Sequence, residues 1–151
     1  AVFVLEALAP AHLHADRFLP PTPLRILMNH KKEQLNLDLP NLEKGTPYKL
    51  LANPKIGREI IPAMLEATQA LAEEEARGII AGASSAMKSQ LQSEIDRLTS
   101  LREVNDHVRP EEIDLAREQL AQLTNVISRS RVRLDTLRLI WKGSPEAITG
   151  A

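Results

Sequence analysis

The sequence contains no cysteine, so neither a disulfide nor thiolate chemistry takes part in its stability or function. Aromatic residues are scarce as well: the 151 residues include two phenylalanines, one tyrosine and one tryptophan. The core must therefore be aliphatic, and few rings are present that could stack on single-stranded bases. The net charge of −1 lacks the positive excess that gives strongly basic proteins most of their affinity for nucleic acid.

Long hydrophobic runs are also missing. No apolar stretch approaches the ~20 residues that a membrane-spanning helix needs, and no signal peptide opens the chain. We therefore expect no membrane partner. A cytoplasmic location agrees with the absence of cysteine, since a reducing compartment does not support disulfides.

Motifs of enzymatic sites are lacking too. The sequence has no glycine-rich phosphate loop, no nucleophile elbow and no zinc-protease motif. His12 and His14 form an H-x-H pair without a third ligand at a recognisable spacing, which favours two loop histidines over a metal site. Ser85 and Lys88 match a bare S-x-x-K whose companion motifs are absent. We predict no catalytic residue, no cofactor site and no metal site, and expect that this chain is not an enzyme.

The residues that are present change in character near residue 53. Before it, residues 2–9 and 24–29 are apolar runs that predict two strands, and residues 35–40 alternate apolar and polar side chains as an edge strand does. We predict a β-rich part over residues 1–52. Because the sequence opens directly in a strand, we expect that this domain was cut from a longer protein.

The segment "FLPPTP" contains three prolines in four positions, namely Pro20, Pro21 and Pro23. Proline fixes φ and lacks an N–H group, so no helix can pass through. A disordered linker, a polyproline ligand for an aromatic groove and a rigid corner are the alternatives. The apolar flanks favour a rigid corner that joins two strands of a sheet, with Phe18 and Leu19 anchoring it in the core.

Helix-forming residues dominate after residue 53. Asn53 is placed to cap a helix whose first residue is a proline. Pro62 should kink or restart this helix, and residues 63–104 then favour one long helix. Gly78 and Gly82 weaken its middle by about 1 kcal/mol each relative to alanine, and we expect them to let another backbone approach closely.

A second helix is predicted after the break "NDHVRP", beginning at Pro110. Its heptad seam consists of Ile113, Ala116, Leu120, Leu123, Ile127, Ser130, Leu134, Leu137 and Trp141. The preceding helix offers a partner seam of Met87, Leu91, Ile95, Leu98 and Leu101. The short connection predicts an antiparallel pair. The predicted fold is thus α+β: a short antiparallel β portion, a long antiparallel helical hairpin over residues 53–142, and a flexible tail over residues 143–151.

Cations gather near the end of this second helix. The candidates for phosphate or partner contacts are Arg129, Arg131, Arg133, Arg138 and Lys142. On a helix, Arg129 and Arg133 would share one face, and Arg131 and Arg138 another. The alternative is that these cations complement the helix dipole, with Asp135 placed to pair with Arg131.

Four stretches occur in an order that resembles a known family: "VFVLEALAP", "ADRFLPPTPLRI", "EIDRLTSLREVNDHVRPEEI" and "RLDTLRLI". Together they resemble the C-terminal end of the RapA (HepA) family, which comprises bacterial RNA polymerase-associated, SWI/SNF helicase-like ATPases. The resemblance runs from about Val2 to about Ile140. It is most specific in "ADRFLPPTP" and "LREVNDHVRP", and loose over residues 31–83.

The resemblance implies a non-catalytic C-terminal module of a large protein that recycles RNA polymerase. ATP and Mg²⁺ would be bound by upstream domains, so no catalytic residue is expected in this chain. The implied partners are core RNA polymerase and other domains of the parent protein, with nucleic acid contacted through the parent. From the residues alone, a free-standing coiled-coil adaptor and a nucleic-acid-binding accessory domain remain alternatives.

Overall fold

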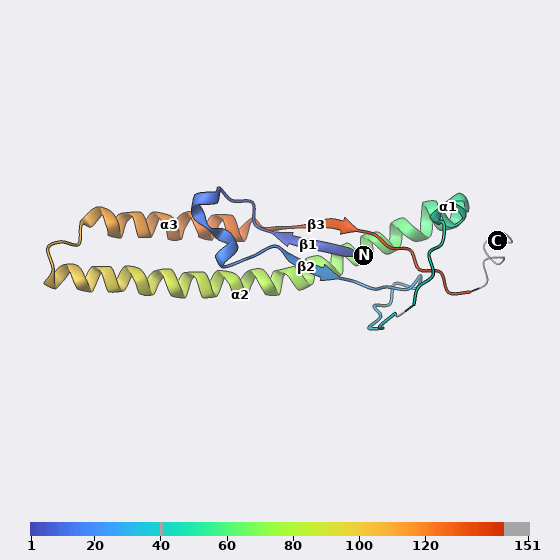
Figure 1. Ribbon diagram of the computed structural model, residues 1–151, viewed down its shortest axis with the longest axis horizontal. Helices are drawn as coiled ribbons and strands as arrows, with labels where there is room; N and C mark the ends of the chain where they lie inside the picture. Colours follow the sequence, from blue (N-terminus) through green and yellow to red (C-terminus); the bar gives the residue numbers. More distant parts are fainter. Residues whose placement is uncertain (40, 144–151) are drawn as a thin grey trace. The chain divides into compact units, whose positions relative to one another are not determined.

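The computed structural model describes residues 1–39 and 41–143. Its elements (Figure 1) are β1 (Val2–Glu6), η1 (Ala11–Leu13), η2 (Ala15–Arg17), β2 (Thr22–Arg25), α1 (Pro47–Ala52), η3 (Ile56–Ile60), α2 (Ile61–Val104), α3 (Pro110–Ser128) and β3 (Arg131–Thr136). The fold is α+β, with a small antiparallel sheet and a long helical hairpin, as the sequence predicted.

The sheet has three strands in the order β2-β1-β3, and β1 runs opposite to both neighbours (Figure 1). Side chains alternate between the two faces of a strand. Phe3 and Leu5 of β1 and Leu24 of β2 are at most 2% exposed and form the buried face. The strand predicted over residues 24–29 is shorter than expected, because β2 ends at Arg25.

The edge strand predicted over residues 35–40 is wrong for its described part, residues 35–39. The backbone there has no strand assignment, and Leu37 and Leu39 are 58% and 37% exposed. An alternating pattern forms a strand only where a neighbouring strand accepts its hydrogen bonds. Here the Leu35 N–H donates to the Leu27 carbonyl at 2.8 Å, next to an isolated bridge between Met28 and Gln34, and the pairing does not extend into a strand. Helix α1 was not predicted, since its surroundings indicated a turn-rich connection.

The start of the long helical region follows the prediction. The Asn53 side-chain oxygen accepts hydrogen bonds from the backbone N–H groups of Lys55 and Ile56, at 3.0 and 3.3 Å. The turn before Pro62 is π-helical, and the Ile61 N–H donates to the Ile56 carbonyl. A widened turn accommodates a proline that cannot supply a helical N–H. The helix therefore restarts as α2, as expected.

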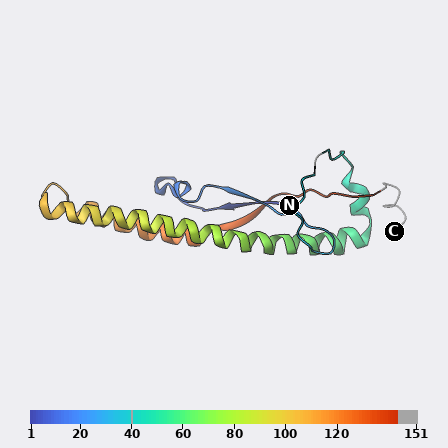
Figure 2. The same ribbon diagram turned by 90° about the horizontal axis from the view of Figure 1, so that it is seen from below.

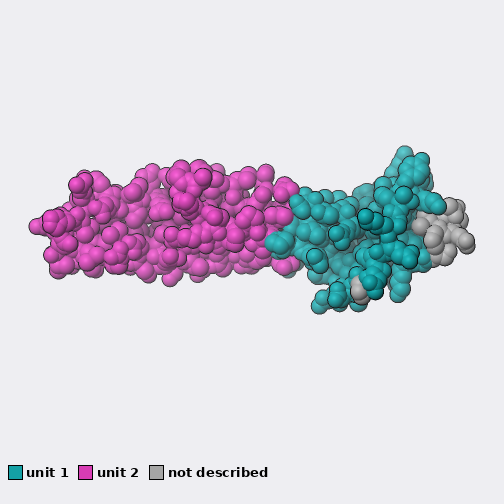
Figure 3. Space-filling view, viewed as in Figure 1, with its two compact units in different colours: residues 1–3, 23–74, 134–151 teal, residues 4–22, 75–133 magenta. Residues whose placement is uncertain are grey.

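The chain forms two compact units (Figure 3). Unit 1 comprises the described residues of 1–3, 23–74 and 134–151. Unit 2 comprises residues 4–22 and 75–133. All three strands and helix α2 contribute residues to both. The predicted domain boundaries after residues 52 and 142 remain a prediction, and the predicted tail lies outside the described residues beyond Gly143.

Within unit 2, α2 and α3 form the predicted hairpin: they run side by side in Figure 1, and in Figure 2 α3 lies behind α2 along its length. The buried seam consists of Met87, Leu91 and Ile95 from α2 and Ile113, Leu123 and Ile127 from α3. Toward the connecting loop the seam opens, since Leu98 is half-buried and Leu101 is 37% exposed. In the loop, the Asn105 side chain accepts a hydrogen bond from the His107 N–H at 3.0 Å, and α3 begins at Pro110 as predicted.

The predicted continuation of α3 to residue 142 is wrong. Helix α3 ends at Ser128, and residues 131–136 form β3. The segment Arg-Val-Arg-Leu-Asp-Thr also alternates charged or polar with apolar residues, which is the period of a strand. Pairing with β1 supplies its backbone with hydrogen-bond partners, and this tertiary contact decides between the two periodicities.

The glycines also differ from expectation. A side chain built at Gly78 or Gly82 meets no atom within 4 Å, so no backbone approaches closely at either position. The close approach occurs instead at Gly57 in unit 1. A Cβ atom there would lie 2.6 Å from the Leu51 carbonyl oxygen, a distance that forces a shift of the backbone. Gly57 therefore allows η3 to pack against the end of α1.

Candidate interaction surface

The arginines of β3 are held by one carboxylate of β1. On a strand, Arg131 and Arg133 point to the same side, and both contact Glu6. The Glu6 Oε1 atom lies 3.6 Å from Arg131 Nη2 and accepts a hydrogen bond from Arg133 Nε at 3.3 Å. The Glu6 side chain is 21% exposed, whereas the arginine side chains are 59% and 49% exposed. The carboxylate thus orients both guanidinium groups while leaving much of each in solvent.

This arrangement changes the predicted set of cations. Helix α3 ends at Ser128, so the arginines beyond it do not share the helical faces that were predicted. Arg131 therefore pairs with Glu6 and not with Asp135, its predicted partner four residues later. Arg129 is the C-terminal cap of α3 and is exposed. The sequence did not indicate Glu6, because Arg133 lies 127 positions away from it along the chain and Arg131 lies almost as far.

The charge of this part of unit 2 is positive. Three arginines, Arg129, Arg131 and Arg133, lie close together in sequence here, and Glu6 contacts two of them. About half of the Arg131 and Arg133 side chains remains exposed to solvent. The exposed parts of these guanidinium groups can contact an anionic partner. Arg138 and Lys142, the other two candidates, are exposed residues of unit 1.

The predicted corner residues run from the end of η2 into β2. Pro20 and Pro21 precede β2, and Pro23 lies within it, so the segment leads directly into the strand that pairs with β1. Leu19 is 2% exposed and anchors the segment, as expected. Phe18 is only half-buried, with the Arg17 guanidinium 4.7 Å from its ring centroid. The role of the prolines as a rigid corner remains a prediction.

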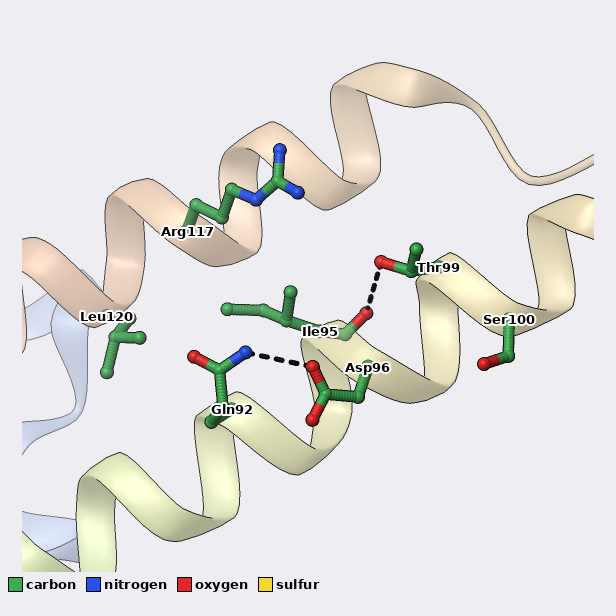
Figure 4. Close-up of a pocket in the computed structure, with 7 residues that line it drawn as sticks. All are labelled: Gln92, Ile95, Asp96, Thr99, Ser100, Arg117 and Leu120. Carbon is green, nitrogen blue, oxygen red and sulfur yellow. Dashed lines mark hydrogen bonds between the residues drawn. The ribbon is translucent and has the colours of Figure 1, made fainter.

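An open groove that sequence reasoning missed runs between α2 and α3 within unit 2 (Figure 4). Its volume is about 370 Å³, and its lining consists of Gln92, Ile95, Asp96, Thr99, Ser100, Arg117 and Leu120. An adjoining groove of about 450 Å³ extends toward the loop and shares Thr99 and Arg117. Ligand pockets bury most of their ligand, and this shallow shape instead suits contact with a surface. No sequence motif could have indicated it, because it depends on how the two helices pack.

Several polar side chains of this groove form hydrogen bonds within their own helix. The Gln92 amide donates to the Asp96 carboxylate at 2.9 Å, and the Thr99 hydroxyl donates to the Ile95 carbonyl at 2.8 Å (Figure 4). On the neighbouring surface of α2, hydrogen bonds from Arg97 lower the pKa of Glu94. Such pairs, three and four residues apart, stabilise an exposed helix.

The two histidines of the H-x-H pair lie in and directly after η1. His12 belongs to η1, and His14 follows it in the left-handed conformation with φ 48°. Across residues 1–39 and 41–143, no group of three or more histidine, cysteine, aspartate or glutamate residues is arranged to hold a metal ion. Over the same ranges, no helix combines the length and apolar character that crossing a bilayer requires.

Comparison with known proteins shows the family to which this chain belongs. A family model described as "RNA polymerase recycling family C-terminal" matches residues 1–142. A curated relative named RNA polymerase-associated protein RapA, from Pectobacterium atrosepticum, is 35% identical over 148 residues, covering 92% of this chain and 15% of the relative. A relative of the same name from Haemophilus influenzae strain PittEE is 35% identical over 145 residues, covering 92% and 16%. The chain therefore spans about one sixth of the length of these relatives.

Proposed function

This chain belongs to the family described as "RNA polymerase recycling family C-terminal". From that premise we propose that it is a non-catalytic module of a longer, RapA-like protein. The observation that carries the proposal is the family match over residues 1–142. The relatives, of which the chain spans 15–16%, are named for their association with RNA polymerase. The sequence itself contains no nucleotide-binding motif.

The partners in this proposal are core RNA polymerase and other domains of the same protein. ATP would be bound and hydrolysed with Mg²⁺ by those other domains, which would also make any contact with nucleic acid. The module would work in the cytoplasm, where transcription takes place in bacteria. Its own contribution would be protein–protein contact.

The candidate contacts to polymerase are the arginines held by Glu6, together with Arg129. Arg131 and Arg133 are half-exposed and preoriented, so little side-chain freedom is lost when they bind. Positive charge at the rim of an interface speeds association with an acidic surface and makes binding sensitive to salt. An acidic face of the polymerase is therefore the surface that this part of unit 2 fits.

The proposal is tested by titrating the purified chain with core RNA polymerase, first by co-elution and then by calorimetry at two salt concentrations. We expect saturable binding that weakens as salt rises. The variant R129S/R131S/R133S should bind at least about tenfold more weakly. The matched control, R77S/R97S/R102S, removes three exposed arginines from α2, one of them also paired with a glutamate.

Circular dichroism must first show that both variants are folded. Equal weakening by the two variants would place the contact away from β3. If the folded, unmodified chain does not bind polymerase at either salt concentration, direct docking on polymerase is rejected.

A further inference from the structure

Large apolar side chains are distributed differently in the two units. Among the described residues of unit 2, eleven hydrophobic residues are buried and four large ones are exposed. In the described part of unit 1 the ratio is reversed, with five buried and nine exposed. Isolated apolar residues on a surface are normal. Unit 1 instead exposes more large apolar side chains than it buries.

The exposed apolar residues of unit 1 belong to three segments, residues 37–39 with Leu42, helix α1 and residues 134–141. Tyr48 is 78% exposed, Leu37 58%, Leu137 43% and Trp141 42%. Full burial of such a side chain is worth about 1.5–3 kcal/mol. A second surface that covers these segments would therefore gain substantial free energy.

The charges in the same segments indicate the chemistry of the covering surface. They include Asp38 in the first, Lys49 in the second, and Asp135 and Arg138 in the third. Two negative and two positive side chains give no excess of either sign, so the segments match neither a phosphate backbone nor an anionic lipid surface. The complementary surface is an apolar protein face.

The length of the relatives indicates where that face comes from. The chain covers only 15–16% of the relatives, so most of such a polypeptide lies outside it. Permanently covered interfaces resemble a domain core cut in half, whereas interfaces that form and separate are about as polar as the rest of the surface. The composition of unit 1 is of the first kind.

We propose that the exposed apolar segments of unit 1, including α1 and residues 134–141, pack against an apolar face of another domain of the same polypeptide. This inference rests on the proposed function as a module of a longer protein. It assigns unit 1 to permanent contact within the protein, while the arginines of unit 2 remain available for polymerase.

The absence of cysteine makes a labelling test direct. Single cysteines are introduced in unit 1 by Tyr48→Cys and Leu137→Cys, and in unit 2 by the controls Val104→Cys and Leu115→Cys, which are 84% and 67% exposed in the wild type. Each variant is made in this chain and in the full-length polypeptide. The rate of reaction with a maleimide is then read at each position by mass spectrometry.

In the isolated chain we expect all four cysteines to react rapidly. In the full-length polypeptide, the two unit 1 positions should slow by at least about tenfold, as expected for a surface exposed only by rare opening. The two unit 2 controls should keep their rates. All four positions are exposed, so the substitutions should leave the fold intact, and circular dichroism of each isolated variant checks this.

Unchanged rates at Tyr48→Cys and Leu137→Cys in the full-length polypeptide would overturn the inference. Slow reaction that already occurs in the isolated chain would also overturn it. If that slowing increased with protein concentration, a second copy would be the cover; if not, other residues of this chain would be. None of these outcomes affects the polymerase titration, so the two proposals fail separately.

Discussion

Unit 2 and unit 1 show two ways in which a chain of ordinary composition uses its apolar residues. In unit 2, helices α2 and α3 bury each other's seams, and Met87, Leu123 and Ile127 have no measurable exposure. In unit 1, the buried core is small, and residues such as Tyr48 and Trp141 are exposed. The helical hairpin buries the central part of both its apolar seams within unit 2. Unit 1 combines segments from three parts of the chain and still leaves most of its large apolar side chains exposed.

The difference indicates that the two units depend on the rest of the polypeptide to different degrees. Packing between two helices is local and needs no further partner. The apolar residues of unit 1 gain their burial only when another surface is present. Stability measured on the isolated chain should therefore come mainly from unit 2.

The largest predicted effect separates the two units by matched leucine substitutions. Leu123→Ala should lower the free energy of unfolding by about 3–5 kcal/mol, because Leu123 is fully buried and its removal leaves a cavity. Leu137→Ala, at a position 43% exposed, should cost no more than about 0.5 kcal/mol in the isolated chain. Urea denaturation followed by circular dichroism measures both. Similar costs would contradict the contrast between the units.

A second prediction concerns the close approach of backbone in unit 1. Gly57→Ala should destabilise the chain by about 1–3 kcal/mol, because the new methyl group would meet the Leu51 carbonyl oxygen at 2.6 Å. Gly78→Ala places its methyl group in open space on α2 and should stabilise by up to about 1 kcal/mol. Thermal denaturation of the two variants should shift in opposite directions. A shift in the same direction would show that the approach at Gly57 is not a constraint.

The smallest effect is expected at the segment before β2. The half-buried Phe18 has less to lose than a core phenylalanine, so Phe18→Ala should cost roughly 1–2 kcal/mol, below the 3–5 kcal/mol typical of a buried ring. Leu19→Ala, at a position 2% exposed, should cost more. Urea denaturation ranks the two. If Phe18 proves to be the costlier position, its ring is the anchor of this segment.

Features determined by neighbouring residues could be predicted from the sequence. The cap by Asn53, the restart at Pro62 and the start of α3 at Pro110 depend on groups within a few positions. The pairing of α2 with α3 followed from two apolar seams joined by a short loop.

Features determined by distant residues could not be predicted. Strand β3 forms where a heptad pattern predicted helix, because its partner β1 lies at the other end of the sequence. The contact of Glu6 with Arg133 spans 127 positions, and no local spacing indicates it. The exposure of Tyr48 and Leu137 is equally invisible in a sequence, since apolar residues are expected to be buried.

The most direct test of the account is hydrogen exchange measured on the isolated chain and on the full-length polypeptide. The account predicts that α2 and α3 in unit 2 are equally protected in both. Protection of α1 and of residues 137–141, which follow β3, should appear only in the full-length polypeptide. Equal exchange of these unit 1 segments in the two samples would contradict the claim that unit 1 is completed by another domain.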